Sequence, residues 1–237
     1  MQIVNGLWFG KIGALEELTL RSFAEHSEFH LWTYENIEVS IPNVVVRDGR
    51  EILPENDIFY YPPEMEIGHG GGSIVGFSER FRYKVLYEKG GWWSDLDVTC
   101  LKPLDEITDE YFFRDHGYIA LVANIMKCPP KSELMRKCYE ASEIQINDKT
   151  TDWHLAMKIM ADYVEELNLS HFIKKDVCNI DKRAFTDKYY KFDEKIPDSW
   201  HFIHWMNTLF ERDHYSINSE YNRLLKQYGV KSPRIMI

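Results

Sequence analysis

The sequence has no excess of positive charge, no clustered cysteines and no long apolar run. Its formal net charge is −10 over 237 residues, which argues against a nucleic-acid-binding protein because such proteins carry a basic surface. Its four cysteines form no CxxC pair and no zinc-like spacing, so we expect isolated reduced thiols. No apolar run approaches the ~20 residues of a membrane span, and the first residues do not resemble a signal peptide. We therefore expect a soluble cytoplasmic protein, and peripheral association with a membrane stays open.

An alternation of strands and helices runs through the chain, and its apolar fraction of 44% is typical of a globular protein. Strand-like and helical periodicity alternates over residues 2–9, 15–25, 29–34 and 44–47, which predicts a mainly parallel α/β sheet flanked by helices. The later expected elements are a helix over 73–89, strands over 92–101 and 119–126, helices over 131–142 and 153–167, and an apolar segment over 201–205. We expect a single domain over 1–237, with extra helices late in the chain.

Two carboxylates one residue apart, Asp95 and Asp97, lie within the predicted strand 92–101. Side chains two apart on a strand share a face, so the two Cα atoms are expected about 6.6 Å apart. Carboxylate oxygens at such a spacing suit Mg²⁺ or Mn²⁺, and a bound divalent cation can hold a diphosphate. An isolated D-x-D is most simply a solvated strand end. Here the pair lies among bulky apolar residues, and buried carboxylates are costly unless they are paired or bind a metal.

A longer pattern surrounds the acidic pair. It consists of Ser78-Glu79-Arg80-Phe81-Arg82, Leu86, Gly90-Gly91, Trp93 and Asp95-Leu96-Asp97. This stretch resembles the glycosyltransferases with a sugar-binding region containing a DXD motif, whose pattern is S-D-x-x-R-x-x-x-L-x-x-x-G-G-x-Y-x-D-x-D. The family includes yeast Och-type mannosyltransferases, bacterial capsular polysaccharide transferases and the catalytic domains of clostridial glucosylating toxins. The spacing is intact over twenty residues, with Glu79 in place of the usual Asp and Trp93 in place of the usual Tyr.

The resemblance implies a nucleotide-binding fold of the GT-A type and a set of site residues. It also implies a nucleotide-sugar-binding half over about 1–105 and an acceptor-side half over about 106–237. Asp95 and Asp97 would hold Mn²⁺ or Mg²⁺, and Ser78, Glu79, Arg82 and Trp93 would contact the donor. Because Glu79 is longer than the usual Asp, it suggests a different donor sugar. The first strand, with Val4-Asn5-Gly6-Leu7-Trp8-Phe9-Gly10, resembles the family's I-H-x-I-W-x-G. By that resemblance Trp8 stacks on the nucleotide base beside Phe9 and Gly10, although a purely structural role for Trp8 is equally consistent with the sequence.

Near the end of the chain, Ile203-His204-Trp205-Met206-Asn207 lies where family members often carry a residue that completes the metal shell. A neutral imidazole is a suitable Mn²⁺ ligand, so His204 is the third expected ligand and His201 a weaker candidate. Two further residues have simpler explanations. His69 lies in a glycine-rich bend that lacks a phosphate-loop lysine, and Asp152 can cap a helix.

The sequence therefore predicts a metal-dependent glycosyltransferase that moves a sugar from a nucleotide-diphosphate donor to a glycan or other acceptor. Retention of configuration, a UDP donor rather than a GDP donor, and a role in polysaccharide biosynthesis follow from the resemblance alone. Two other classes stay open. A retaining glycoside hydrolase uses two carboxylates about 5–5.5 Å apart, and a carbohydrate-binding module could hold Ca²⁺ with the same pair. The donor sugar, the acceptor, the oligomeric state and the source organism are not readable from the sequence.

Overall fold

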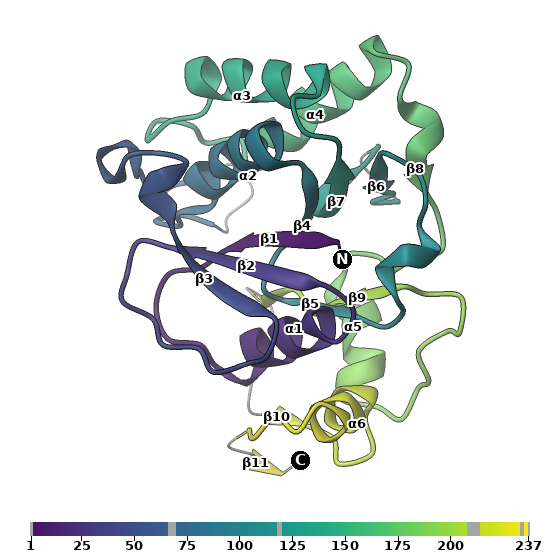
Figure 1. Ribbon diagram of the computed structural model, residues 1–237. Helices are drawn as coiled ribbons and strands as arrows, with labels where there is room; N and C mark the ends of the chain where they lie inside the picture. The colour runs from purple at the N-terminus through teal and green to yellow at the C-terminus, as the bar shows by residue number, and fades with distance from the viewer. Residues whose placement is uncertain (1, 66–69, 118–119, 208–213, 233–234, 237) are drawn as a thin grey trace.

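A computed structural model describes residues 2–65, 70–117, 120–207, 214–232 and 235–236. Its central feature is a seven-stranded sheet with helices on both faces (Figure 1). The strands are β1 (Ile3–Leu7), β2 (Glu28–Thr33), β3 (Val44–Asp48), β4 (Gly91–Ser94), β5 (Val98–Cys100), β6 (Phe112–Arg114), β7 (Val122–Cys128), β8 (Ile173–Lys174), β9 (Phe202–His204), β10 (His214–Tyr215) and β11 (Ile235–Met236). The α-helices are α1 (Ala14–Ala24), α2 (Val75–Lys89), α3 (Glu133–Gln145), α4 (Leu155–Glu166), α5 (Arg183–Tyr190) and α6 (Glu220–Gln227).

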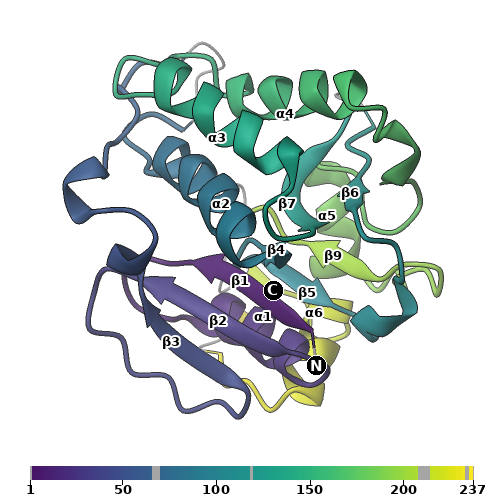
Figure 2. The same cartoon turned by 45° about the horizontal axis from the view of Figure 1, so that its top comes forward.

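The strand order of the sheet is β3-β2-β1-β4-β7-β6-β8. The first four strands are parallel to one another, and Figure 2 shows them side by side. Strand β7 runs antiparallel to both β4 and β6, whereas β6 and β8 are parallel. The predicted α/β class, with a mainly parallel sheet between helices, is confirmed. The order also places β2 and β4 on opposite sides of β1, so the direction of winding reverses at β1.

Two apolar cores cover the two faces of the sheet. Helices α2, α3 and α4 lie on one face, and α1, α5 and α6 lie on the other (Figure 1). The neighbouring residues Trp92 and Trp93 of β4 belong to different cores because successive strand side chains point to opposite faces. Both indoles are fully buried. This two-sided burial explains why the strand sequence is apolar at consecutive positions.

The predicted strand 92–101 is wrong in one respect, because the chain leaves the sheet in its middle. Strand β4 ends at Ser94, and the amide of Val98 donates to the carbonyl of Asp95 at 3.3 Å, which closes a turn over 95–98. The chain then continues as β5, which pairs antiparallel with β9 in a separate two-stranded ribbon. Asp95 and Asp97 therefore lie on a turn at the end of the sheet and not on one face of a continuous strand.

The helix before β4 ends where the sequence predicts. Gly90 and Gly91 have positive φ angles of 67° and 86°, a conformation that favours glycine. A Cβ at Gly90 would also lie 2.5 Å from the Pro130 ring. This stop delivers the chain from α2 directly into β4.

Other differences concern short or polar elements. The sequence did not predict β6, β8, β10, β11, α5 or α6, and the expected helices after residue 130 begin about two residues later than predicted. The predicted strand 119–126 corresponds to β7, and its first residue, Ile119, lies outside the described residues, as do Gly68 and His69. All four cysteines are free, and three of them are buried.

We predict that Phe202→Ala destabilises the fold by about 3–5 kcal/mol, the usual cost of removing a buried phenyl ring. Phe202 is fully buried in β9 and contacts Phe23, Trp92 and Phe112. The free energy of unfolding in urea measures the effect. Phe192→Ala is the matched control because Phe192 is 64% exposed and should change the free energy by less than about 0.5 kcal/mol. Equal losses in the two variants would contradict this account of the core.

Candidate active site

A cavity of about 590 Å³ opens at the carboxyl ends of β1 and β4. Trp8 and Phe9 follow β1, and Asp95 follows β4; all three line the cavity. Parallel α/β sheets bind ligands outside the carboxyl ends of their strands, at the point where the direction of winding reverses. The position of the cavity between β1 and β4 is therefore where this topology favours a ligand site.

One face of α2 forms a wall of the cavity. Ser78, Glu79 and Arg82 all line it, because residues three and four apart share a helix face. The Arg82 guanidinium donates to Glu79 Oε2 at 2.7 Å and to Asp95 Oδ1 at 2.8 Å. Its side chain is only 2% exposed, so this buried cation joins helix α2 to the carboxylate that follows β4.

A second donor fixes the same oxygen of Asp95. The indole Nε1–H of Trp93 donates to Asp95 Oδ1 at 2.7 Å, and the Arg82 guanidinium lies 4.9 Å from the centre of the Trp93 ring. Burial raises the pKa of Asp95 and of Glu79, and the charge of Arg82 opposes this rise in both. Asp95 Oδ2 accepts no hydrogen bond from the described residues, so this oxygen is available to a ligand.

Asp97 is held by the last part of the chain. Its Oδ2 accepts the backbone N–H of Asn207 at 2.8 Å and lies 3.3 Å from His204 Nε2. The ribbon of β5 and β9 causes this contact, because Val98 pairs with His204 across it. The Trp205 backbone N–H also donates to the Asp97 carbonyl at 2.8 Å. Within the described ranges, Asp97 Oδ1 accepts no hydrogen bond.

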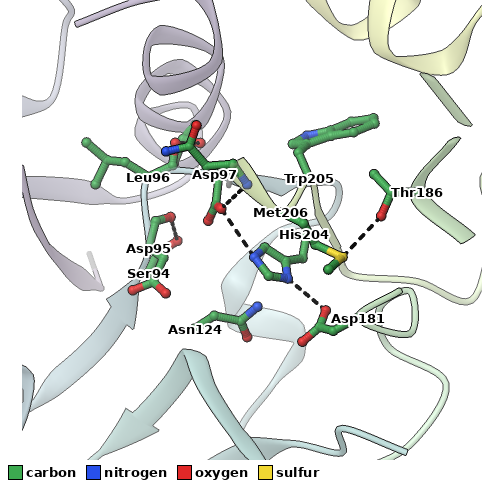
Figure 3. A network of polar contacts seen from close by, with 12 residues as sticks. Ser94, Asp95, Leu96, Asp97, Asn124, Asp181, Thr186, His204, Trp205 and Met206 are labelled. Carbon is green, nitrogen blue, oxygen red and sulfur yellow. Dashed lines mark hydrogen bonds and ion pairs between the residues drawn. The ribbon is translucent and has the colours of Figure 1, made fainter. Parts of the chain in front are cut away.

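The other nitrogen of His204 faces a further carboxylate. His204 Nδ1 lies 2.7 Å from Asp181 Oδ1, so the imidazole bridges Asp181 and Asp97 (Figure 3). Burial alone would lower the pKa of His204, but the two carboxylates raise it well above its ordinary value. In turn, His204 helps to hold the pKa values of Asp97 and Asp181 below their ordinary range, against the effect of burial. The two carboxylates favour the imidazolium form of His204, and both of its ring nitrogens face a carboxylate oxygen.

The sequence-predicted residues divide into two groups. The cavity is lined by Trp8, Phe9, Ser78, Glu79, Arg82, Asp95, Asp97 and His204. Gly10 and Trp93 are not among the described lining residues. Gly10 is exposed and donates its N–H to Glu35 Oε2 at 2.6 Å. Trp93 is buried and contacts Asp95 through its indole N–H. His201, the weaker histidine candidate, lies 3.3 Å from Glu106 instead.

Several lining residues were missed by the sequence reasoning. They include Asp181, Asn124, His116 and His154. Asn124 Oδ1 accepts from Arg114 at 3.1 Å, and its buried amide nitrogen has no hydrogen-bond partner in the described part of the chain. No periodicity or motif marks these positions, since they meet the acidic pair only through tertiary structure. Trp153, the first residue of the expected helix 153–167, also lines the cavity.

Among the described residues, no group of three or more His, Cys, Asp or Glu side chains is arranged to hold a metal ion by itself. Among the helices in the same ranges, none has the length and apolar character that crossing a bilayer requires.

A comparison with protein-family models agrees with the sequence pattern. Residues 73–114 match the model of the family described as "Glycosyltransferase sugar-binding region containing DXD motif". A search of curated proteins gave no match. Among solved structures, the chain is similar to "PaToxG Glycosyltransferase", with a TM-score of 0.42, 11% sequence identity, and coverage of 72% of this chain and 75% of that chain. The matched segment runs from the start of α2 through the acidic pair to β6, and it is this segment that is similar to the DXD-containing sugar-binding region of glycosyltransferases.

Proposed function

We propose that this protein is a metal-dependent glycosyltransferase that uses a nucleotide-diphosphate sugar. The observation that carries the proposal is the arrangement of Asp95 and Asp97 in one cavity, each with one carboxylate oxygen free of hydrogen bonds from the described residues. Two hard oxygen donors suit Mg²⁺ or Mn²⁺, which keep several positions for water and phosphate oxygens. The chain then needs to supply few ligands.

The charge balance of the cavity fits a divalent cation. Among the described lining residues, four carry carboxylates, namely Glu79, Asp95, Asp97 and Asp181. Arg82, Arg114 and protonated His204 contact them. When all four are ionised, three positive charges face four negative ones. A bound cation would compensate the remaining negative charge and favour the approach of a diphosphate.

Each group has a proposed role toward the donor. A divalent metal, when bound, stabilises the negative charge that develops on the leaving diphosphate. Asp95 and Asp97 hold that metal, and Arg82 orients Asp95 and, with Glu79, faces the donor sugar. Trp8 and Phe9 form the apolar side of the cavity that suits a base. His204 would become a metal ligand only by giving up its contact with Asp97, so in this geometry it acts first on Asp97.

Retention of configuration by front-face attack is the proposed stereochemical course. Among the described lining residues, every carboxylate already contacts Arg82, His204 or Arg114, so none stands apart as a nucleophile. A leaving phosphate that accepts the acceptor's proton would complete the step. We propose UDP as the preferred nucleotide and a glycan as the acceptor, with residues 1–105 supplying most of the donor site.

We expect UDP to bind only when Mn²⁺ or Mg²⁺ is present, because the diphosphate would otherwise meet the carboxylates directly. Isothermal titration calorimetry with UDP and with GDP, each with Mn²⁺ and with EDTA, measures this. Metal-dependent binding of GDP alone would keep the function and change the donor. If neither nucleotide binds with metal, the proposal is wrong, and a glycoside hydrolase or a carbohydrate-binding module becomes the better hypothesis for the function.

Asp97→Asn should reduce donor hydrolysis by about 10³-fold, since it weakens an interaction on the order of several kcal/mol in the transition state. The rate of release of free sugar from the nucleotide sugar measures the loss, and circular dichroism checks that the fold persists. Asp109→Asn is the control because Asp109 is 41% exposed, pairs with Lys174 and lies outside the lining residues. Turnover near the wild-type rate in Asp97→Asn would remove the metal role from Asp97.

The metal-free protein should lose stability as the pH rises from about 6.5, the ordinary pKa of histidine. The pKa of His204 is raised in the folded state, so its contribution is complete below that pH and disappears as the pH passes through the raised value. Urea unfolding in EDTA between pH 6 and pH 9 measures the slope, with His204→Gln as the comparison. An equal slope in both proteins would show that the imidazolium does not stabilise the fold.

A further inference from the structure

Asp181 reaches the proposed metal-binding pair through one intervening side chain, that of His204. Its Oδ1 lies 2.7 Å from His204 Nδ1, and His204 Nε2 lies 3.3 Å from Asp97 Oδ2 (Figure 3). An imidazole is planar and rigid, so the direction of one ring nitrogen determines the direction of the other. Whatever orients Nδ1 therefore also directs Nε2 toward Asp97.

The position of Asp181 is itself fixed by a buried cation. Arg114 donates to Asp181 Oδ1 at 2.7 Å and to Oδ2 at 3.1 Å. The Arg114 side chain is 1% exposed and that of Asp181 is 9% exposed. Bidentate pairing of this kind restricts the carboxylate to one plane and one position. Arg114 belongs to β6, so the central sheet determines where Asp181 lies.

The backbone of His204 is fixed separately. Asn179 Oδ1 accepts the His204 N–H at 2.7 Å, and Asn179 Nδ2 donates to the His204 carbonyl at 2.8 Å. Asn179 is 1% exposed. The segment that carries Asn179 and Asp181 thus holds both the main chain and the ring of His204.

This arrangement has a consequence for Asp97. His204 and the Asn207 N–H both occupy Oδ2, which leaves Oδ1 as the oxygen free for a ligand. Without a fixed imidazole the carboxylate could rotate and exchange its two oxygens. Mutation of residues that orient the direct ligands of a metal typically changes metal affinity or activity 10–100-fold.

We propose that Asp181 is a positioning residue that fixes the carboxylate of Asp97 through the imidazole of His204. The proposal rests on the proposed function, because the orientation of Asp97 matters for turnover only if Asp97 takes part in it. Asp181 itself need not touch the donor.

The first test is Asp181→Asn, which keeps the shape of the side chain and removes its charge. We expect kcat for donor hydrolysis to fall about 10–100-fold. In a His204→Gln background the same change should cause no further loss, because Asp181 acts only through the ring, and residues in one network are not additive. A kcat within two-fold of the wild type, or losses that simply add, would overturn the proposal.

The second test uses the metal-free protein and needs no turnover. The Nδ1–H proton of His204, bonded to a carboxylate, should give a slowly exchanging downfield NMR signal. The signal should shift upfield in Asp181→Asn, disappear in His204→Gln and remain in Asp97→Asn, which leaves the Nδ1 contact intact. An unchanged signal in Asp181→Asn would contradict the assigned contact.

Glu220→Gln is the matched control. Glu220 is also a buried carboxylate held by two cations, Lys195 at 2.9 Å and Arg223 at 2.7 Å, and its side chain is 4% exposed. It does not line the cavity of the acidic pair. It should lower the urea midpoint without lowering kcat, whereas an equal loss of kcat in Glu220→Gln would attribute the effect of Asp181→Asn to stability.

If Asp181→Asn does not fold, Asp181→Glu replaces it. This variant keeps the charge that Arg114 requires and displaces the imidazole, so the same fall in kcat is expected, and wild-type kcat would overturn the proposal.

Asp97→Asn distinguishes a failure of the proposed function from a failure of the inference about Asp181. If Asp97→Asn remains active, the proposed function fails; if Asp97→Asn is inactive while the Asp181 variant has wild-type kcat, the inference about Asp181 alone fails.

Discussion

The site depends on the pairing of partly buried carboxylates with cationic side chains. Glu79, Asp95, Asp97 and Asp181 line one cavity, and an unpaired buried charge is too costly for a folded protein to keep. Arg82 pairs with Glu79 and Asp95, and Arg114 pairs with Asp181. His204 lies between Asp97 and Asp181 and contacts both. When all four carboxylates are ionised, one negative charge is left unmatched, and this charge supports our proposal that the cavity binds a divalent cation.

Three parts of the fold bring these charges together. Helix α2 presents Glu79 and Arg82 from one face, the turn after β4 presents Asp95 and Asp97, and the ribbon of β5 and β9 brings His204 back to Asp97. The ribbon exists only because the chain leaves the sheet at Ser94. The departure from a continuous strand is therefore the feature that joins the last quarter of the chain to the acidic pair.

The sequence predicts the spacing of those site residues that lie close together in the chain. Glu79 and Arg82 are three residues apart on a helix that ends at two glycines. The structure keeps this spacing on one helix face because helix geometry and helix caps are determined by residues close in sequence. The turn over 95–98 was not predicted, since the apolar residues on both sides of Asp95 fit a continuous strand as well as a turn.

The distant half could not be predicted in the same way. Asp181 and Asn179 meet His204 across more than twenty residues, and Arg114 meets Asp181 across 67 residues. Short polar segments carry no periodicity that would reveal such contacts. Helix α6 is different, because Ser219 caps it and Tyr221, Leu224 and Leu225 follow at helical spacing. That signal was present in the sequence and was overlooked.

The central claim is that Asp95 and Asp97 hold a metal against a nucleotide diphosphate. The most direct measurement is a crystal structure with UDP and Mn²⁺, with anomalous diffraction recorded at the manganese absorption edge. The account predicts one manganese peak that contacts the carboxylates of Asp95 and Asp97 and the oxygens of the diphosphate. Bound UDP with no manganese at the acidic pair, or manganese held elsewhere in the cavity, would contradict it.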